Sequence, residues 1–283
     1  MIVDAHAHVF RPASVLPRAV DELAPAQRDA PVEDLLATME AAGVERAVLV
    51  PLGTEDEYVA SVLADHPGRF AAIAVADGAI LEGDVAALDA RRAEFPFHGV
   101  RTQWLGEPGR PLEASPLLPV LRAMAERGLV LWTYLAPGQL RLLGELPAAV
   151  PELRIVLNHL GFCPHDMRVD AHGRPSFEDP FPDGSLEPVL ALAEHEHAHV
   201  MFSGHYALSA EDPPYRDLDL VVSRLFDAYG AGRMLWASDY PWTRDVPGYA
   251  SLLELAPPGA TRAGMDAIHG GTALKLFPHL GPV

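Results

Sequence analysis

The chain has 283 residues, a length that one hydrophobic core still supports and that is close to the ~250 residues of a typical α/β barrel. Hydrophobic residues make up 49% of the sequence, which excludes a wholly disordered protein. The 39 acidic residues exceed the 21 basic ones and give a net charge of −18 at pH 7, with no local basic cluster to offset it. We therefore expect no nucleic-acid partner.

Several other classes of protein are also excluded. The sequence has no run of about 18 apolar residues that could span a bilayer, and residues 1–10 lack the basic and apolar regions of an export signal. The single cysteine, Cys163, cannot form an intrachain disulfide, which fits a reducing compartment. We expect a cytoplasmic protein with no membrane partner. Because Lys275 is the only lysine, chemistry that needs a lysine deep in a site has no candidate.

Short β-branched or apolar runs alternate with amphipathic stretches along the whole chain. The runs predict eight strands, at Ile2–Val9, Arg46–Pro51, Phe70–Ala76, Gly99–Trp104, Leu129–Leu135, Arg154–His159, Val200–Tyr206 and Met234–Asp239. The amphipathic stretches predict helices at Pro31–Ala42, Asp56–His66, Val85–Glu94, Pro116–Arg127, Gln139–Ala148, Leu186–His195 and Asp217–Tyr229. Eight such βα units favour a closed (β/α)8 TIM barrel, forming one domain over residues 1–283.

Two predicted connections are unusually long. Phe10–Ala30 follows the first strand, and Leu160–Ser185 follows the sixth. In this kind of barrel the loops that leave the C-terminal ends of the strands build the active site. Long loops inside a compact domain are often functional, so we expect both to act as lids.

Polar side chains stand at the same end of three predicted strands. His6 and His8 lie two apart on the first strand, so a period of two places both on one face, with Asp4 one step deeper. His159 ends the sixth strand and Asp239 ends the eighth. Three histidines and a carboxylate thus converge at one mouth, where they could hold a metal or perform acid–base chemistry. The structural alternative is a capping role for Asp239 and a hydrogen-bonded core position for His159.

Further polar residues fall at this mouth. His205 ends the seventh strand and is a candidate proton donor or substrate contact. Arg11, Arg168, Arg174 and Arg244 lie in the mouth loops, where arginines would attract an anionic substrate and pair with its carboxylates. The alternative for each arginine is a solvated position on the surface.

Three segments of the sequence resemble the amidohydrolase superfamily, in particular its branch of 2-pyrone-4,6-dicarboxylate lactonases and sugar-acid lactonases. The resemblance covers essentially the whole chain. The segments that carry it are His6-Ala7-His8, Asn158-His159-Leu160-Gly161, and Gly232-Arg233-Met234-Leu235-Trp236-Ala237-Ser238-Asp239-Tyr240-Pro241.

This sequence also differs from the superfamily pattern at one informative position. Metal-dependent members of the superfamily carry a histidine at the end of the fifth strand, where this chain has Leu131-Trp132-Thr133-Tyr134-Leu135. The fourth strand has no lysine or carboxylate that could bridge two metals. The chain is therefore similar to metal-independent lactonases, in which an arginine and a tyrosine face the substrate, and the matching residues here are Arg101 and Tyr134.

We expect a hydrolase that opens a small, carboxylated lactone or ester with activated water. In this hypothesis Asp239 is the general base, and the donors that stabilise charge on the carbonyl oxygen are Arg101, Tyr134, His6, His8 and His159. Contacts with a small anionic substrate would come from His205, Arg168, Arg174 and Arg244. The sequence does not determine the oligomeric state.

The expected cofactor is either none or one weakly bound divalent ion. Zinc at His6, His8 and Asp239, with His159 as a further ligand, would lower the pKa of its bound water. One alternative function is a zinc-dependent decarboxylase or hydratase. Such an enzyme is expected to carry a histidine at the end of the fifth strand, which this chain lacks. Another is a catalytically inactive ligand-binding barrel, against which the intact set of polar residues argues.

Overall fold

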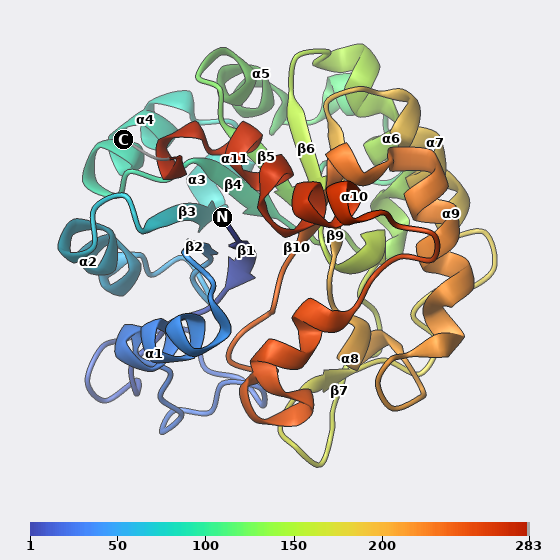
Figure 1. Ribbon diagram of the computed structural model, residues 1–283. Helices are drawn as coiled ribbons and strands as arrows, with labels where there is room; N and C mark the ends of the chain where they lie inside the picture. The colour runs from blue at the N-terminus through green and yellow to red at the C-terminus, as the bar shows by residue number, and fades with distance from the viewer. Residues whose placement is uncertain (282–283) are drawn as a thin grey trace.

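The computed structural model describes residues 1–281, and an eight-stranded parallel sheet forms its centre (Figure 1). The strands in sheet order are β1 Val3–Ala7, β2 Arg46–Leu49, β3 Phe70–Val75, β4 Gly99–Thr102, β5 Val130–Thr133, β6 Arg154–Leu157, β9 Ala198–Phe202 and β10 Met234–Trp236. A parallel bridge between Ala7 and Tyr240 returns the last strand to the first. The predicted (β/α)8 barrel is confirmed, although the strands end one to four residues earlier than predicted.

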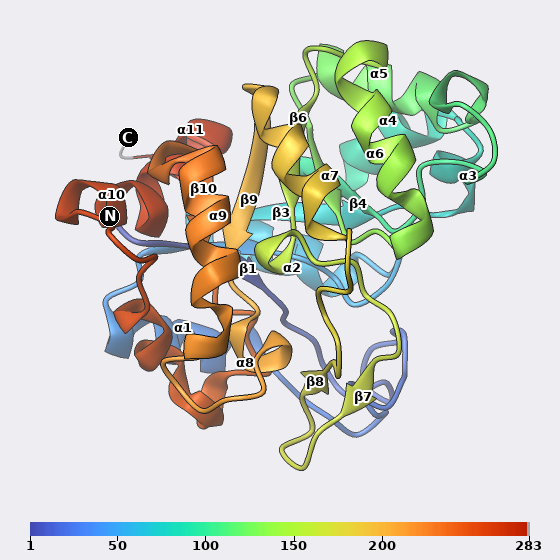
Figure 2. The ribbon, with the colours of Figure 1, turned by 90° about the vertical axis from the view of Figure 1, so that its right-hand side faces the viewer.

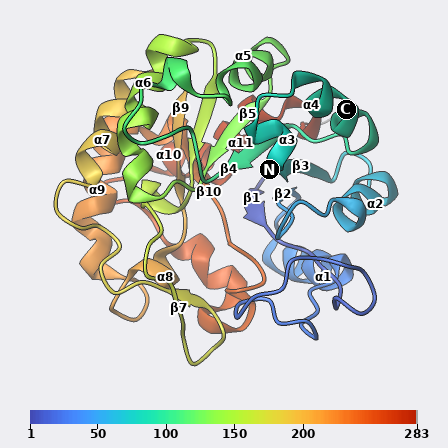
Figure 3. The same ribbon diagram turned by 180° about the vertical axis from the view of Figure 1, so that it is seen from behind.

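Helices surround the sheet (Figure 3). They are α1 Val32–Ala42, α2 Glu57–Asp65, α3 Gly78–Leu81, α4 Val85–Glu94, α5 Leu118–Glu126, α6 Leu140–Ala149, α7 Leu186–Ala191, α8 His205–Leu208, α9 Asp219–Tyr229, α10 Arg262–Asp266 and α11 Thr272–Leu276. The seven predicted helices correspond to α1, α2, α4, α5, α6, α7 and α9. Among the described residues no helix combines the length and apolarity needed to cross a membrane. The single domain over residues 1–283 stays a prediction, since residues 282–283 lie outside the described part.

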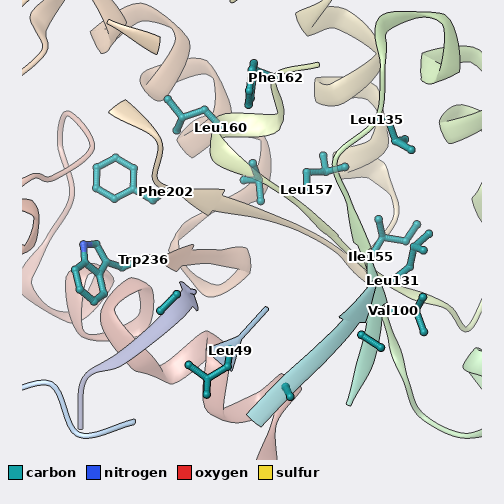
Figure 4. Close-up of a cluster of buried hydrophobic side chains, with 14 of the residues drawn as sticks. Leu49, Val100, Leu131, Leu135, Ile155, Leu157, Leu160, Phe162, Phe202 and Trp236 are labelled. Carbon is teal, nitrogen blue, oxygen red and sulfur yellow. The ribbon is translucent and has the colours of Figure 1, made fainter. Parts of the chain in front are cut away.

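Alternate residues of each strand pack on opposite sides of the sheet. In β5, Trp132 points into a cluster that fills the barrel interior, whereas Leu131 packs outward. Figure 4 shows this outward layer, in which Leu131 lies near Val100 of β4 and Ile155 of β6. Buried strands of a parallel sheet therefore carry apolar side chains on both faces, which is why their sequence runs are almost continuously hydrophobic.

The C-terminal segment closes one end of the barrel. Leu276 of α11 and the following Phe277 and Leu280 belong to the interior cluster, together with Trp132. They lie at the end of the barrel where the strands begin, since Arg154, the first residue of β6, donates to the Leu276 carbonyl. The polar site therefore lies toward the other end of the barrel, with this apolar cluster beneath it.

β1 carries an irregularity just before the site. Asp4 pairs with Ala47 of β2, but the next aligned pair is Ala7 with Leu49, so three steps along β1 match two along β2. An extra residue of this kind reverses the alternation of side chains and commonly re-aims a side chain beside an active site. It turns His6 toward the interior, next to Trp132.

The expected position of Asp4 below the histidines is therefore wrong. Its carboxylate lies in the seam between β1 and β10, where it accepts hydrogen bonds from the Ser238 backbone N–H at 2.9 Å, the Ser238 hydroxyl at 2.5 Å and the Tyr249 hydroxyl at 2.9 Å. These bonds offset the cost of burying a carboxyl group. Burial still raises its pKa to about 6.

The two long loops lie side by side (Figure 2). The second contains a small antiparallel hairpin, formed by β7 Arg168–Val169 and β8 Pro175–Ser176, which the sequence did not predict. Arg28 of the first loop donates to the Gly173 carbonyl of the second at 2.9 Å and lies 4.5 Å above the Trp242 ring. One arginine thus ties both loops to the segment that follows β10.

Candidate active site

A cavity of about 560 Å³ opens among the loops that follow the barrel strands. Its walls include Asp21 from the first long loop and Met167 from the second, which fits their expected position over the site. The residues that the structure brings together around this cavity include His6, His8, Arg101, Tyr134, His159 and Asp239. They come from β1, β4 and the segments that directly follow β1, β5, β6 and β10.

Asp239 lies at the centre of this group. It has a left-handed backbone with φ of 60°, and its N–H donates to the His6 carbonyl at 3.0 Å, which joins β1 to the end of β10. One carboxylate oxygen lies 3.7 Å from His6 Nε2 and 3.6 Å from His8 Nε2, and the other lies 3.7 Å from His159 Nε2. Burial opposes ionisation, but His159 and then the other two histidines outweigh it and hold the pKa of Asp239 well below its usual range.

Tyr206 is a site residue that the sequence analysis missed. Its hydroxyl donates to Asp239 Oδ2 at 2.6 Å, and both side chains are buried. Gly204 precedes it with φ of 79°, and a Cβ at that position would lie 2.6 Å from the Cβ of His159. The chain therefore turns at a residue that has to be glycine, and the turn directs Tyr206 rather than His205 toward Asp239.

His6 and His8 form part of a line of hydrogen bonds across the cavity floor. Trp132 Nε1 donates to His6 Nδ1 at 3.1 Å, and His6 Nε2 lies 3.1 Å from His8 Nε2. His8 Nδ1 lies 2.6 Å from the Val50 carbonyl oxygen, which can only accept, so this nitrogen donates. Burial first, and then His8, hold the pKa of His6 well below 6.5.

Arg101 and Tyr134 face the cavity as a stacked pair. The Arg101 guanidinium lies 4.5 Å from the centre of the Tyr134 ring, a cation–π contact that fixes both groups. Burial raises the pKa of Tyr134 to about 12, against the opposing effect of Arg101, so its hydroxyl stays protonated at neutral pH. Both side chains are therefore hydrogen-bond donors toward the cavity.

His205 is not part of this cavity. Its ring packs against Phe202 and stacks on Tyr215, and it lines a separate cavity of about 200 Å³. Burial, with a smaller effect from His159, lowers its pKa to about 3, so the ring is neutral. The structure gives His205 a packing environment away from Asp239.

The loop arginines are also placed elsewhere, each beside a carboxylate. Arg168 is exposed and pairs with Glu178 at 2.6 Å, and Arg244 pairs with Asp34 at 3.3 Å. Arg174 pairs with Asp170 at 2.7 Å, with its guanidinium over the Tyr206 ring, and Arg11 pairs with Asp29 at 3.5 Å. None of the four is among the residues that line the cavity of Asp239 in the described part of the chain.

A possible metal-ligand set is present at this site. His6, His159 and Asp239 each offer one atom, and these atoms lie within 4.8 Å of one another. All three side chains are buried. Two imidazoles and a carboxylate are ligand types that suit Zn²⁺.

Comparison with known proteins gives the chain its family. The sequence profile of the amidohydrolase family matches residues 3–279. The L-fucono-1,5-lactonase of Burkholderia ambifaria is 26% identical over 258 residues, which cover 86% of this chain and 81% of that protein. A solved structure of a candidate 2-pyrone-4,6-dicarboxylic acid hydrolase from Pseudomonas putida is 25% identical, with a TM-score of 0.74 and coverage of 98% of this chain and 97% of that one.

More distant structures share the fold. An amidohydrolase from Burkholderia multivorans with bound zinc is 21% identical, with a TM-score of 0.74 and coverage of 98% and 99% of the two chains. The 5-carboxyvanillate decarboxylase of Sphingomonas paucimobilis is 17% identical, with a TM-score of 0.63 and coverage of 98% of each chain. Because the family profile spans nearly all of the sequence, this chain belongs to the amidohydrolase family and is a hydrolase with a TIM-barrel fold.

Proposed function

We propose that this hydrolase opens a small lactone by attack of water on the ring carbonyl. The observation that carries the proposal is the position of Asp239, a buried carboxylate that shares one cavity with the donors Arg101 and Tyr134. Two relatives at 25–26% identity support the reaction class, since each is named for hydrolysis of a cyclic ester.

In this mechanism Asp239 accepts a proton from water as the water oxygen bonds to the carbonyl carbon. The carbonyl oxygen becomes an oxyanion, and the side chains that would stabilise it are Arg101 and Tyr134. Collapse of the tetrahedral intermediate breaks the ring carbon–oxygen bond, and the leaving alkoxide takes the proton back from Asp239. The product is an open hydroxy acid. The lowered pKa keeps Asp239 ionised at neutral pH, at some cost in its strength as a base.

The cavity favours a lactone that carries hydroxyl groups and no charged group. Arg101 is the one arginine or lysine among the described residues that line it. If Arg101 binds the carbonyl oxygen, no guanidinium remains for a substrate carboxylate. Asp21 and Gln103, which also line the cavity, are suited to bind hydroxyl groups. An uncharged sugar lactone is thus our leading substrate class.

A carboxylated lactone is the second candidate, and the relative from Pseudomonas putida favours it. In that case Arg101 would pair with the carboxylate, and the oxyanion would depend on Tyr134. The same cavity serves both substrate classes, so the two candidates differ in the role of Arg101.

A substrate panel tests the proposal. Sugar 1,4- and 1,5-lactones, 2-pyrone-4,6-dicarboxylate and an open-chain ester would be assayed by proton release, each with and without a chelator. We expect turnover of sugar lactones that the chelator leaves unchanged. Turnover of the dicarboxylate alone would favour the second candidate. Binding of lactones without any turnover would refute the proposed function.

A further inference from the structure

The hydrogen bond between Trp132 and His6 determines which nitrogen of His6 carries a proton. An indole N–H can only donate, so His6 Nδ1, at 3.1 Å, has to present its lone pair. A ring in that state is neutral and carries its single proton on Nε2. Both residues are fully buried, with 0% exposure, so water does not compete for the bond.

The next two hydrogen bonds along the floor of the cavity run in the same donor-to-acceptor direction. His6 Nε2–H faces His8 Nε2 at 3.1 Å, and His8 has its own proton on Nδ1, where it donates to the Val50 carbonyl at 2.6 Å. His8 Nε2 is therefore a lone pair that accepts from His6. The line from Trp132 to Val50 is satisfied at every atom, with each hydrogen bond pointing the same way.

This arrangement does not fit a metal ion bound through His6. The distance between the two Nε2 atoms is compatible with an N–H···N bond, and it is also close to the roughly 3.3 Å between two nitrogen ligands of tetrahedral zinc. The tautomer decides between them, because a metal needs the Nε2 lone pair and a ligating histidine donates from its other nitrogen. His8 has that arrangement, and His6 has the reverse. Tyr206 also occupies one oxygen of Asp239.

We propose that Trp132 is a positioning residue that holds His6 with its proton on Nε2, so that this nitrogen offers no lone pair to a metal and the site binds zinc weakly. Neither the tautomer nor the metal affinity depends on the proposed function. The metal-dependent members of the superfamily, from which this sequence departs, carry a histidine at the end of the fifth strand. Here the same strand supplies an indole that keeps another candidate ligand protonated.

Nitrogen NMR of the metal-free protein tests the tautomer directly. With 15N-labelled histidine, the ring of His6 is identified by the signals that disappear in the His6→Gln variant. We expect an unprotonated Nδ1 and a protonated Nε2, with the opposite pattern for His8. A proton on Nδ1 of His6 would overturn the proposal, and this experiment needs no Trp132 variant to fold.

Zinc titration of two matched variants tests the consequence. Trp132→Phe removes the indole N–H that faces His6, whereas Trp242→Phe removes an indole that lines the cavity beside His8 and leaves His6 Nδ1 untouched. We expect zinc to bind at least about 10-fold more tightly to Trp132→Phe, which equals about 1.4 kcal/mol, and within about two-fold of wild type to Trp242→Phe. A folded Trp132→Phe variant with unchanged zinc affinity would refute the role of Trp132.

Failure of the two proposals is distinguishable. A protein that turns over no lactone but shows the expected tautomer and zinc response loses the proposed function and keeps the role of Trp132 in setting the state of His6. A protein that hydrolyses lactones but carries the opposite tautomer keeps the proposed function and loses this one.

Discussion

Tyr206 donates its hydroxyl to the same carboxylate oxygen of Asp239 that lies nearest His159 Nε2. Since a hydrogen bond to the charged form favours ionisation, Tyr206→Phe should raise the pKa of Asp239. In the wild type, activity is lost only as the pH falls through a pKa below 3.8, and in the variant the loss should begin at higher pH. We also expect kcat/KM at neutral pH to fall about 10-fold, because the Tyr206 hydroxyl fixes the position of the carboxylate and losing that hydrogen bond outweighs the gain in its strength as a base.

A pH profile of kcat/KM measures both effects. Tyr215→Phe is the matched control, because this buried tyrosine stacks on His205 outside the cavity. If the acid limb of the Tyr206→Phe profile coincides with that of the wild type, the hydrogen bond does not tune Asp239.

Removing the proposed base is a second test. Asp239→Asn preserves the shape of the side chain but cannot accept the proton, so kcat should fall at least ~100-fold. Asp21→Asn makes the same change in another residue of the same cavity and should alter KM more than kcat. Thermal melting would show whether both variants are folded. Near-normal turnover by a folded Asp239→Asn variant would make this residue structural.

The arginines offer a contrast between the cavity and its surroundings. Arg101→Met should lower kcat/KM by ~100-fold or more, about 2.7 kcal/mol at the transition state, because it removes a donor to the oxyanion. Arg168→Met should change kcat/KM by less than about two-fold, since Arg168 is exposed and pairs with Glu178. Steady-state kinetics on a confirmed substrate decide the matter. A large loss in Arg168→Met would show that the second long loop reaches the substrate.

Stability should decline on acidification because several buried or half-buried histidines are neutral in the folded state. Burial, followed by His279, lowers the pKa of His98 to about 4, and burial also lowers those of His199 and His205, to about 4 and about 3. Below pH 6.5 these histidines bind protons in the unfolded chain but stay neutral in the folded protein. The free energy of unfolding therefore falls as the pH drops from 6.5 toward 4. Asp4 acts in the opposite sense, since its raised pKa favours the folded state at acid pH and that contribution is lost as the pH rises through about 6.

Urea denaturation at a series of pH values measures this balance. His98→Phe keeps an aromatic ring against His279 and removes one titrating group. The variant should recover on the order of 2 kcal/mol of the stability that the wild type loses between pH 6.5 and 4. An identical pH dependence in the two proteins would show that His98 does not contribute.

Much of the site follows from strand order alone. Parallel strands end at one edge, so His159 and Asp239 could be placed together from the positions of two apolar runs. The position of a residue along its strand predicted less well which way its side chain points. The irregular pairing in β1 removes Asp4 from the cavity, and the turn at Gly204 directs Tyr206, rather than the predicted His205, toward Asp239.

The loop arginines and Trp132 show what sequence could not supply. Arg244 pairs with Asp34, which is 210 residues away in the sequence, and Trp132 donates to His6, which is 126 residues away. No local pattern encodes such a pair, because it depends on how loops and strands close in space. An arginine at a predicted mouth is therefore compatible with either a substrate or a carboxylate of the protein itself.

The closure between β1 and β10 relies on a few side-chain bonds to Asp4 and on single backbone bonds, such as that from Asp239 N–H to the His6 carbonyl. The histidine pair stands on one side of this seam and the base on the other. Local opening there would separate the reacting groups while most helices stay packed. We therefore expect catalysis to fail in mild denaturant before helical structure is lost, and the amide of Asp239 to exchange its hydrogen in step with that failure. Loss of turnover would then indicate that the seam between β1 and β10 has opened, before the rest of the barrel unfolds.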